Sequence, residues 1–322
     1  MVDLKRIGIL TSGGDSPGMN TAIRAVTRTA LQNGLEVIGI EQGYQGIFDK
    51  SFVELGPRDV GGVMQRGGTF LYTARCARFL NPAGRAEALE NLRAAGIEAL
   101  VIVGGNGSLT GGLELERLGM PVVGLPGSID NDLYGTDVAI GVDSCLNTIL
   151  HAIDNIKDTA SSHRRAFILE VMGRNSGYLA MMSALSGGAE VAIIPEIPTD
   201  MEEVALKLRA AFERGKSHFI IVVAEGAQLK TSEIYAYLRE HTSVEARVTI
   251  LGHIQRGGAP SAFDRILATR LGYAAVQTLL EGKSGVMMGL SGNSIVATPL
   301  EEVITRPKPV DLVGFEMIKF LS

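Results

Sequence analysis

Short hydrophobic runs rich in branched side chains alternate with longer amphipathic segments along most of this 322-residue chain. Several of the short runs contain no polar residue, which is typical of strands buried on both faces of a parallel sheet. The runs that we predict to be strands are RIGIL, VIGI, ALVIV, PVVGL, FILEV, VAIIP, HFIIVVAE and VTIL.

The longer segments carry their hydrophobic residues at helical spacing. Between residues 142 and 156 such side chains recur three or four positions apart, which indicates a helix with one face in the core. Further helices are predicted over residues 22–31, 85–95, 201–214 and 261–280. Because strands and helices alternate, we expect an α/β protein with mostly parallel sheets and helices on both faces.

Composition narrows the class of protein. The 40 glycines follow no collagen-like period, so they indicate many tight strand-to-helix turns. The formal net charge of -5 argues against a general nucleic-acid binder, which normally carries a basic face. A nucleic acid is therefore not an expected partner. A membrane is not expected either, because no apolar run is long enough to span a bilayer.

Localisation is suggested by the cysteines and by the apolar runs. Cys76 and Cys145 lie far apart and form no CxxC or metal-ligand spacing. The N-terminal sequence reaches glycine before a signal-peptide core could form, and the longest apolar stretch, Phe219–Ala224, is too short to cross a bilayer. We expect a soluble cytoplasmic protein.

Two glycine-rich segments follow predicted strands and suit phosphate binding. TSGGDSPGMN (residues 11–20) and GGNGSLTGG (residues 104–112) would let backbone N–H groups approach an anion near a helix N-terminus. Neither has the Walker A or the GxGxxG pattern. An ordinary tight turn remains the alternative for either segment alone, and Ser108 could simply cap a helix. Two such segments at one sheet edge favour a phosphate ligand.

A pair of carboxylates follows the strand PVVGL. If the segment PGSIDND is extended, Asp130 and Asp132 project to the same side. Such a pair suits a base that accepts a hydroxyl proton and a partner for Mg²⁺. An Asx-turn is the structural alternative.

Cationic residues near strand ends form a third group. Arg174 follows FILEV, His253 and Arg256 follow VTIL, and Arg165 and Arg247 precede the same two strands. Arginines at strand ends are typical of bidentate phosphate recognition, although each alone is more often a surface ion-pair partner.

The segments TSGGDSPGMN, RGGTFLYTAR, GGNGS, PGSIDND, EVMGRNSG and LGHIQRGG together resemble the bacterial-type ATP-dependent 6-phosphofructokinase family. The resemblance implies two similar three-layer α/β domains with largely parallel sheets, the phosphofructokinase fold. Residues 1–141 and 255–305 would bind ATP, and residues 142–254 and 306–322 would bind fructose 6-phosphate. The resemblance also implies a homotetramer.

The implied reaction, a committed step of glycolysis, transfers the ATP γ-phosphoryl group to the 1-hydroxyl of fructose 6-phosphate. Asp130 matches the base that takes the hydroxyl proton. Arg75 and Arg174 would stabilise the transferring phosphoryl group, and Ser128, Asp132 and Gly14 also match the catalytic positions. The positions that match ATP contacts are Gly14, Tyr44, Arg75, Cys76, Asn106, Gly107, Ser108 and Gly111.

Two further sets of residues follow from the resemblance. Those implied to hold fructose 6-phosphate are Ser128, Asp130, Met172, Gly173, Arg174, Glu225, His253 and Arg256, with Arg165 and Arg247 from a neighbouring subunit. Those matching an effector site for a nucleotide diphosphate or phosphoenolpyruvate are Arg24, Arg28, Lys157, Gly188, Glu190, Arg214 and Lys216.

The chain departs from the family pattern at Asn106, where the family has an aspartate that serves the Mg²⁺ bound to ATP. Asparagine keeps a carbonyl ligand and loses a negative charge. Two alternatives to an active kinase stay open. A weakly catalytic regulatory subunit would explain Asn106. A pyrophosphate-dependent enzyme is disfavoured, because its relatives carry larger groups at the positions of Gly107 and Gly127.

Overall fold

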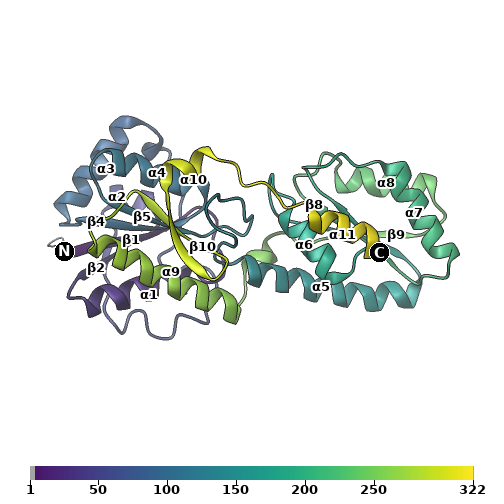
Figure 1. Ribbon diagram of the computed structural model, residues 1–322, viewed down its shortest axis with the longest axis horizontal. Coiled ribbons are helices and arrows are strands. Elements are labelled where there is room, and N and C mark those ends of the chain that lie inside the picture. Colours follow the sequence, from purple (N-terminus) through teal and green to yellow (C-terminus); the bar gives the residue numbers. More distant parts are fainter. Residues whose placement is uncertain (1–3, 322) are drawn as a thin grey trace. The chain divides into compact units, whose positions relative to one another are not determined.

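The computed structural model describes residues 4–321, which form two compact units. Residues 4–144 and 256–308 make up the first unit, and residues 145–255 and 309–321 make up the second. Figure 1 labels the elements of each unit. The predicted domain ranges also contain residues 1–3 and 322, which lie outside the described residues.

The first unit is built on one sheet whose strands run in the order β11-β10-β5-β4-β1-β2-β3. All neighbours are parallel except the two outermost pairs, β10–β11 and β2–β3. The strands are β1 (Arg6–Ser12), β2 (Glu36–Ile40), β3 (Phe52–Glu54), β4 (Ala99–Gly104), β5 (Val122–Pro126), β10 (Val286–Ser291) and β11 (Ser294–Pro299).

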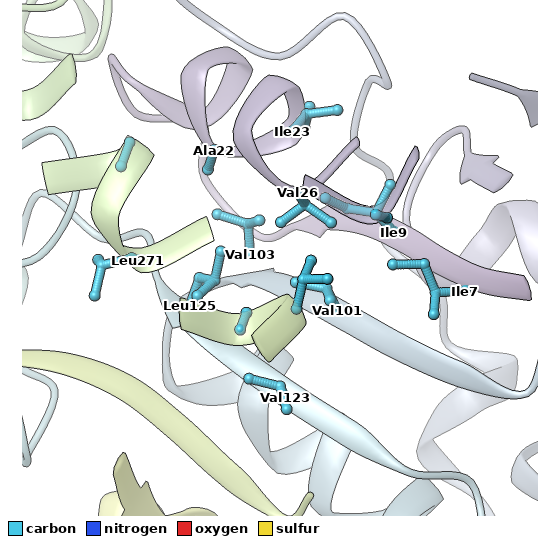
Figure 2. Packing of buried hydrophobic residues seen from close by; sticks show 14 of the residues in the cluster. Ile7, Ile9, Ala22, Ile23, Val26, Val101, Val103, Val123, Leu125 and Leu271 are labelled. Atoms are coloured by element: carbon cyan, nitrogen blue, oxygen red, sulfur yellow. The ribbon is translucent and has the colours of Figure 1, made fainter. Parts of the chain in front are cut away.

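Helices cover both faces of this sheet. Side chains alternate along the buried strands, so Ile9 and Val101 enter one core while Leu10 and Leu100 enter the other. Figure 2 shows the first of these cores, where α1 and α9 pack on β1, β4 and β5. The helices of the unit are α1 (Met19–Gln32), α2 (Tyr44–Asp49), α3 (Pro82–Ala94), α4 (Asn106–Arg117), α9 (Ala262–Leu280), α10 (Leu300–Thr305) and the 3-10 turn η1 (Arg78–Leu80).

The second unit has a parallel sheet with the order β7-β8-β6-β9. One face packs on α7 and α8, and the other packs on α6, which contacts α11. The elements are β6 (Ala166–Val171), β7 (Val191–Ile193), β8 (Phe219–Ala224), β9 (Ala246–Ile250), α5 (Val142–His163), α6 (Tyr178–Gly187), α7 (Met201–Glu213), α8 (Thr231–His241), α11 (Val313–Leu321) and the 3-10 turn η2 (Gly252–Arg256). Helix α5 begins in the first unit, and η2 ends there.

The predicted α/β class with mostly parallel sheets is confirmed, and every predicted strand and helix is present. The sequence patterns missed two kinds of element. The first kind comprises the short or antiparallel elements β3, β10, β11 and α10. The second kind comprises helices such as α4, whose glycine-rich start hides its helical period. In the part of the chain that the structure describes, no helix combines the length and the apolar character that a bilayer crossing needs.

Asp264 on α9 ties the start of α5 into the first unit. Its carboxylate is fully buried and accepts hydrogen bonds from the Gly141 and Ser144 N–H groups, both at 2.8 Å, and from the Ser144 hydroxyl at 2.5 Å. Burial raises the pKa of Asp264, and the three hydrogen bonds oppose that shift. The carboxylate therefore satisfies three donors in a region without water access.

We expect Asp264→Ala to lower the free energy of unfolding by about 3 kcal/mol, because it leaves buried donors without an acceptor. Chemical denaturation would measure the change. Asp49→Ala is the matched control, since the exposed Asp49 carboxylate accepts, within residues 4–321, only from Gln45 on its own helix. That control should change stability by less than about 0.5 kcal/mol. Equal effects of the two substitutions would contradict the role given to Asp264.

Candidate active site

Three neighbouring strands of the first unit end at the same level. In the parallel register, Ser12 of β1 pairs with Gly104 of β4, and Gly104 pairs with Pro126 of β5. The loops that follow these strands therefore begin side by side at the carboxyl edge of the sheet. Ligands bind at this edge in open α/β folds.

The first two loops approach each other closely because their residues are small. A Cβ added at Gly104 would lie 2.6 Å from the Ser12 carbonyl oxygen and 2.7 Å from the Ser108 Cβ. Gly13 has a φ of +87°, and a Cβ there would lie 3.3 Å from the Ser108 hydroxyl oxygen. Around Gly107, by contrast, an added Cβ would meet nothing within 4 Å. The glycines thus close the base of the site, and open space remains above it.

The segment predicted as the second glycine loop is largely the beginning of α4. The N-cap is Gly105, without a side-chain cap, and Asn106, Gly107 and Ser108 lie in the first helical turn. The interpretation of Ser108 as the N-cap is therefore wrong. The first backbone N–H groups of a helix precede any intrahelical acceptor and carry partial positive charge, so this end of α4 suits an anion. The Ser108 N–H already donates to the Gly105 carbonyl at 3.0 Å.

The third loop brings a carboxylate against this helix end. Asn106 donates from Nδ2 to Asp132 Oδ2 at 3.1 Å, and the Ser128 hydroxyl donates to Asp132 Oδ1 at 3.4 Å. Asp130 is only 4% exposed. Asn106, Ser128 and Asp132 are therefore brought together as one hydrogen-bonded group.

The assumption that residues 126–132 are extended is wrong. Asp130 lies in a turn, and the next residue, Asn131, has a left-handed φ of +52°. The Asn131 side chain accepts from the Ala139 N–H at 3.1 Å and donates to the Asp137 carbonyl at 3.0 Å. Sequence reasoning missed this role, although asparagine is among the residues that tolerate left-handed turns.

Residues 69–73 run along the first glycine loop. The Thr11 hydroxyl hydrogen-bonds the Thr69 hydroxyl at 2.8 Å and the Tyr72 carbonyl at 3.0 Å, and the Thr73 hydroxyl donates to the Gly13 carbonyl at 2.8 Å. Two residues later the chain presents Arg75, whose side chain is exposed. The partly buried Cys76 packs against the core beneath α4.

Tyr44 supports α4 from below. Its hydroxyl donates to the Ser108 carbonyl at 2.5 Å, and its ring stacks on Phe79 with centroids 4.1 Å apart. A Cβ added at Gly111 would lie 2.7 Å from the Tyr44 hydroxyl oxygen. Burial raises the pKa of Tyr44. With 6% of its surface exposed, Tyr44 presents little area to a ligand.

Arg256, in the first unit, lies on the first glycine loop. A Cβ added at Gly14 would overlap its guanidinium group. Among residues 4–321 the buried Nε of Arg256 has no hydrogen-bond partner. The structure thus places Arg256 against the Gly14 backbone, in a different unit from His253, which is exposed on η2.

In the second unit, strand ends again bring predicted residues together. Glu225, directly after β8, accepts at Oε1 from the N–H groups of Gly173 and Arg174, at 3.3 and 2.9 Å. Gln255 accepts from the Met172 N–H at 3.1 Å and donates to the Gly252 carbonyl at 2.9 Å. Gln255 was not singled out from the sequence, although it lies inside LGHIQRGG.

Arg165 and Arg247 lie at the opposite edge of this sheet. Both bind the carboxylate of Glu245, with 2.7 Å between Arg165 Nε and Glu245 Oε2. These contacts lower the pKa of Glu245. Arg247 is inside β9, whereas the sequence pattern placed it before the strand. Within the second unit, neither arginine joins the group of Glu225 and Arg174.

The predicted effector residues of the second unit cluster around a buried carboxylate. Glu190 is 3% exposed, accepts from the Ile220 N–H at 2.5 Å and forms an ion pair with Lys216. Lys157 donates to the Gly187 carbonyl next to Gly188, which has a φ of +61°. The sequence missed the neighbouring His218, whose pKa is lowered by burial. Arg214 is exposed at the end of α7.

The other two predicted effector residues lie in the first unit. Arg24 donates to the Val60 carbonyl at 3.3 Å, and Arg28 donates to the Pro57 carbonyl at 2.8 Å. Both arginines therefore hold the segment of residues 57–60 against α1.

Comparisons with known proteins agree with this architecture. The ATP-dependent 6-phosphofructokinase 1 of Thermus thermophilus is 56% identical over 321 residues, which cover 99% of this chain and 100% of the relative. The ATP-dependent 6-phosphofructokinase of Thermotoga neapolitana is 51% identical over 320 residues, covering 99% of this chain and 100% of the relative.

Solved structures give the same result for the fold. The phosphofructokinase of Pichia pastoris in the T-state superposes with a TM-score of 0.90 at 38% identity, over 94% of this chain and 37% of the yeast chain. This chain therefore spans less than half the length of that relative. A pyrophosphate-dependent phosphofructokinase from Marinobacter aquaeolei, at 23% identity, has a TM-score of 0.87 over 96% of this chain and 86% of that one, which shows the shared fold.

A family profile described as Phosphofructokinase matches residues 6–279. Together with the two bacterial relatives, this match covers both units and all three loops at the carboxyl edge of the first sheet. The chain belongs to the phosphofructokinase family.

Proposed function

We propose that this protein transfers the γ-phosphoryl group of ATP to the 1-hydroxyl of fructose 6-phosphate, giving fructose 1,6-bisphosphate and ADP. The observation that carries the proposal is the meeting of three loops after β1, β4 and β5, where a helix N-terminus, the Asp132 carboxylate and small residues lie together. Phosphoryl transfer depends mainly on positioning and charge stabilisation, which this arrangement supplies.

Each group has a proposed role in the reaction. The Asp130 carboxylate would take the proton of the sugar hydroxyl as that oxygen attacks phosphorus. Arg75 and Arg174 would stabilise negative charge on the transferring phosphoryl group, and the Gly14 N–H would orient it. The first turn of α4 would hold the donor phosphates, and the open space at Gly107 leaves room for a nucleotide there.

Magnesium would accompany ATP and neutralise charge on its phosphates. Within residues 4–321 no cluster of three or more histidine, cysteine, aspartate or glutamate side chains is suited to hold a metal alone. Magnesium bound to nucleotides needs few protein ligands, because phosphate oxygens and water supply the rest. Asn106 fits this requirement: its Nδ2 is engaged by Asp132, and its amide oxygen is the hard donor that would hold the ion.

The second unit would bind fructose 6-phosphate. Glu225 accepts from the N–H groups of Gly173 and Arg174, so it holds the chain directly after β6, where the sugar would bind. Met172 and His253 would complete this group, and Arg256 is also proposed to bind fructose 6-phosphate. Arg165 and Arg247 lie at the other sheet edge, which supports the proposal that they serve a neighbouring subunit of a homotetramer.

An effector site is also part of the proposal. The cations around Glu190 suit an anion such as a nucleotide diphosphate or phosphoenolpyruvate. Arg24 and Arg28 are also proposed to contact an effector. The protein would act in the cytoplasm, which is compatible with the free thiols of Cys76 and Cys145.

The proposed reaction is tested by measuring fructose 1,6-bisphosphate formation from fructose 6-phosphate and Mg²⁺, with ATP or pyrophosphate supplied in parallel. We expect turnover with ATP alone, because a Cβ added at Gly107 would meet nothing within 4 Å, which leaves room for a nucleotide. Turnover with pyrophosphate alone would contradict the assigned donor. Binding of both ATP and sugar phosphate without turnover would favour a regulatory subunit, and Asn106→Asp would then be the variant to assay.

Asp130→Asn should lower kcat by a factor of about 10²–10⁴ and leave both KM values within a few-fold, because it removes a base and keeps the side-chain volume. Steady-state kinetics at saturating Mg²⁺ would measure this. Asp49→Asn, at an exposed site on α2, is the control and should have normal kcat. An Asp130→Asn enzyme with normal kcat would exclude Asp130 as the base.

Gly14→Ala should raise the KM for fructose 6-phosphate, because the added methyl group displaces the Arg256 guanidinium while the Gly14 N–H is kept. Arg256→Ala should also raise this KM, because it removes the guanidinium itself. The double variant provides the sharper measurement. If Gly14 acts through Arg256, adding Gly14→Ala to Arg256→Ala should change KM little further. Independent, multiplying effects would show that Gly14 does not act through this contact.

A further inference from the structure

The loop that carries Asp130 and Asp132 is strongly acidic. Residues 130–137, DNDLYGTD, contain three aspartates and no lysine or arginine. The hydrogen bonds to Asp132 come from an amide and a hydroxyl, which are both neutral groups. A phosphorylated substrate at this loop would add further negative charge, so a nearby cation would lower the electrostatic repulsion there.

Cations reach this loop from residues 306–308, the short segment after α10 that ends the first unit. Arg306 donates to the Tyr134 hydroxyl at 3.0 Å, and its charge is paired with Glu302 at 3.2 Å. Lys308 donates from Nζ to the Asp137 carbonyl at 2.9 Å. The segment thus contacts the acidic loop at two places.

Lys308 shares its acceptor with a residue that shapes the loop. The Asp137 carbonyl also accepts from the side chain of Asn131, which lies between Asp130 and Asp132 in the chain. The rest of Asp137 is fixed as well: its N–H donates to the Leu290 carbonyl at 2.7 Å, and its carboxylate accepts from the Gly292 N–H at 2.7 Å. Lys308 is therefore bound to a residue whose N–H, carbonyl and carboxylate groups are all hydrogen-bonded.

The charge of Lys308 acts on the carboxylates of this loop. Burial lowers the pKa of Lys308 to about 8, and the charges of Asp137 and Asp132 act in the opposite direction by favouring the ammonium form. The lysine is therefore mainly charged at neutral pH. The Lys308 ammonium and the carboxylates of Asp137 and Asp132 therefore attract one another.

We propose that Lys308 is a positioning residue of the phosphoryl-transfer site, whose ammonium group holds the Asp130–Asp137 loop and offsets part of its negative charge. This inference rests on the proposed function. In the resting protein the lysine anchors the Asp137 carbonyl. During transfer it lowers the repulsion between the loop carboxylates and the phosphoryl oxygens.

The test compares Lys308→Met, Lys308→Gln and Lys308→Arg with the wild-type chain in the assay of fructose 1,6-bisphosphate formation from ATP. Methionine removes both charge and donor, glutamine keeps an N–H donor without charge, and arginine keeps both. We expect kcat to fall about tenfold with methionine and with glutamine, which corresponds to about 1.4 kcal/mol, while both KM values change less than about twofold. Arginine should restore most of kcat.

Arg306→Gln is the matched control, because Arg306 contacts the same loop through Tyr134 and has its charge paired with Glu302. It should leave kcat within about twofold of the wild type. Thermal unfolding of every variant shows whether it folds. If Lys308→Met lowers stability, the comparison of glutamine with arginine still separates charge from anchoring, because both side chains keep a donor.

Three outcomes would overturn the inference. Full activity of Lys308→Gln would reduce Lys308 to a loop anchor, and full activity of Lys308→Met would remove it from the site. A folded Lys308→Arg enzyme as slow as the glutamine variant would contradict the role of charge. Each requires an active wild type, whereas a wild-type chain without turnover would overturn the proposed function together with this inference.

Discussion

The parallel register of β1, β4 and β5 determines where chemistry can occur in the first unit. Since Ser12, Gly104 and Pro126 lie in one row, three loops start at the same level and must share a small space. Larger side chains would not fit in that space, because a Cβ added at Gly13 or Gly104 would already come close to the Ser108 side chain. Helix α4 begins directly after β4 at this edge, so its leading N–H groups lie where the three loops start.

Loops packed this tightly need partners for their polar groups, and buried side chains provide them. Asn20 on α1 donates to the carbonyls of Arg66 and Gly67 and accepts from the Phe70 N–H. Asn131 plays a similar part in the third loop, and Asp264 does so at the start of α5. Each of these side chains replaces water at backbone groups that the fold has buried. The site is therefore rigid at its base, where the strands end.

In the second unit, a carboxylate and an amide side chain hold the backbone that follows β6. Glu225 binds the N–H groups of Gly173 and Arg174, and Gln255 binds that of Met172, so two side chains fix three consecutive residues after β6. Cations are distributed differently, with Arg165 and Arg247 joined through Glu245 at the far edge of the sheet. Within the second unit, the strand end that carries Arg174 and the sheet edge that carries Arg165 and Arg247 are therefore separate.

The sequence by itself determined the α/β class, the long helices, the buried strands and the segments that carry chemistry, because these depend on local periodicity and on glycine-rich motifs. It failed where a role depends on partners distant in the chain. Asp130 and Asp132 lie beside a left-handed Asn131, which no period-two argument could foresee, and Gln255 and Lys308 are recognisable only by the carbonyl or N–H groups that they meet. Arg256 and His253 are three residues apart, yet they belong to different units. Tertiary structure decided these placements because hydrogen-bond register and burial, rather than local pattern, select which polar groups come within bonding distance.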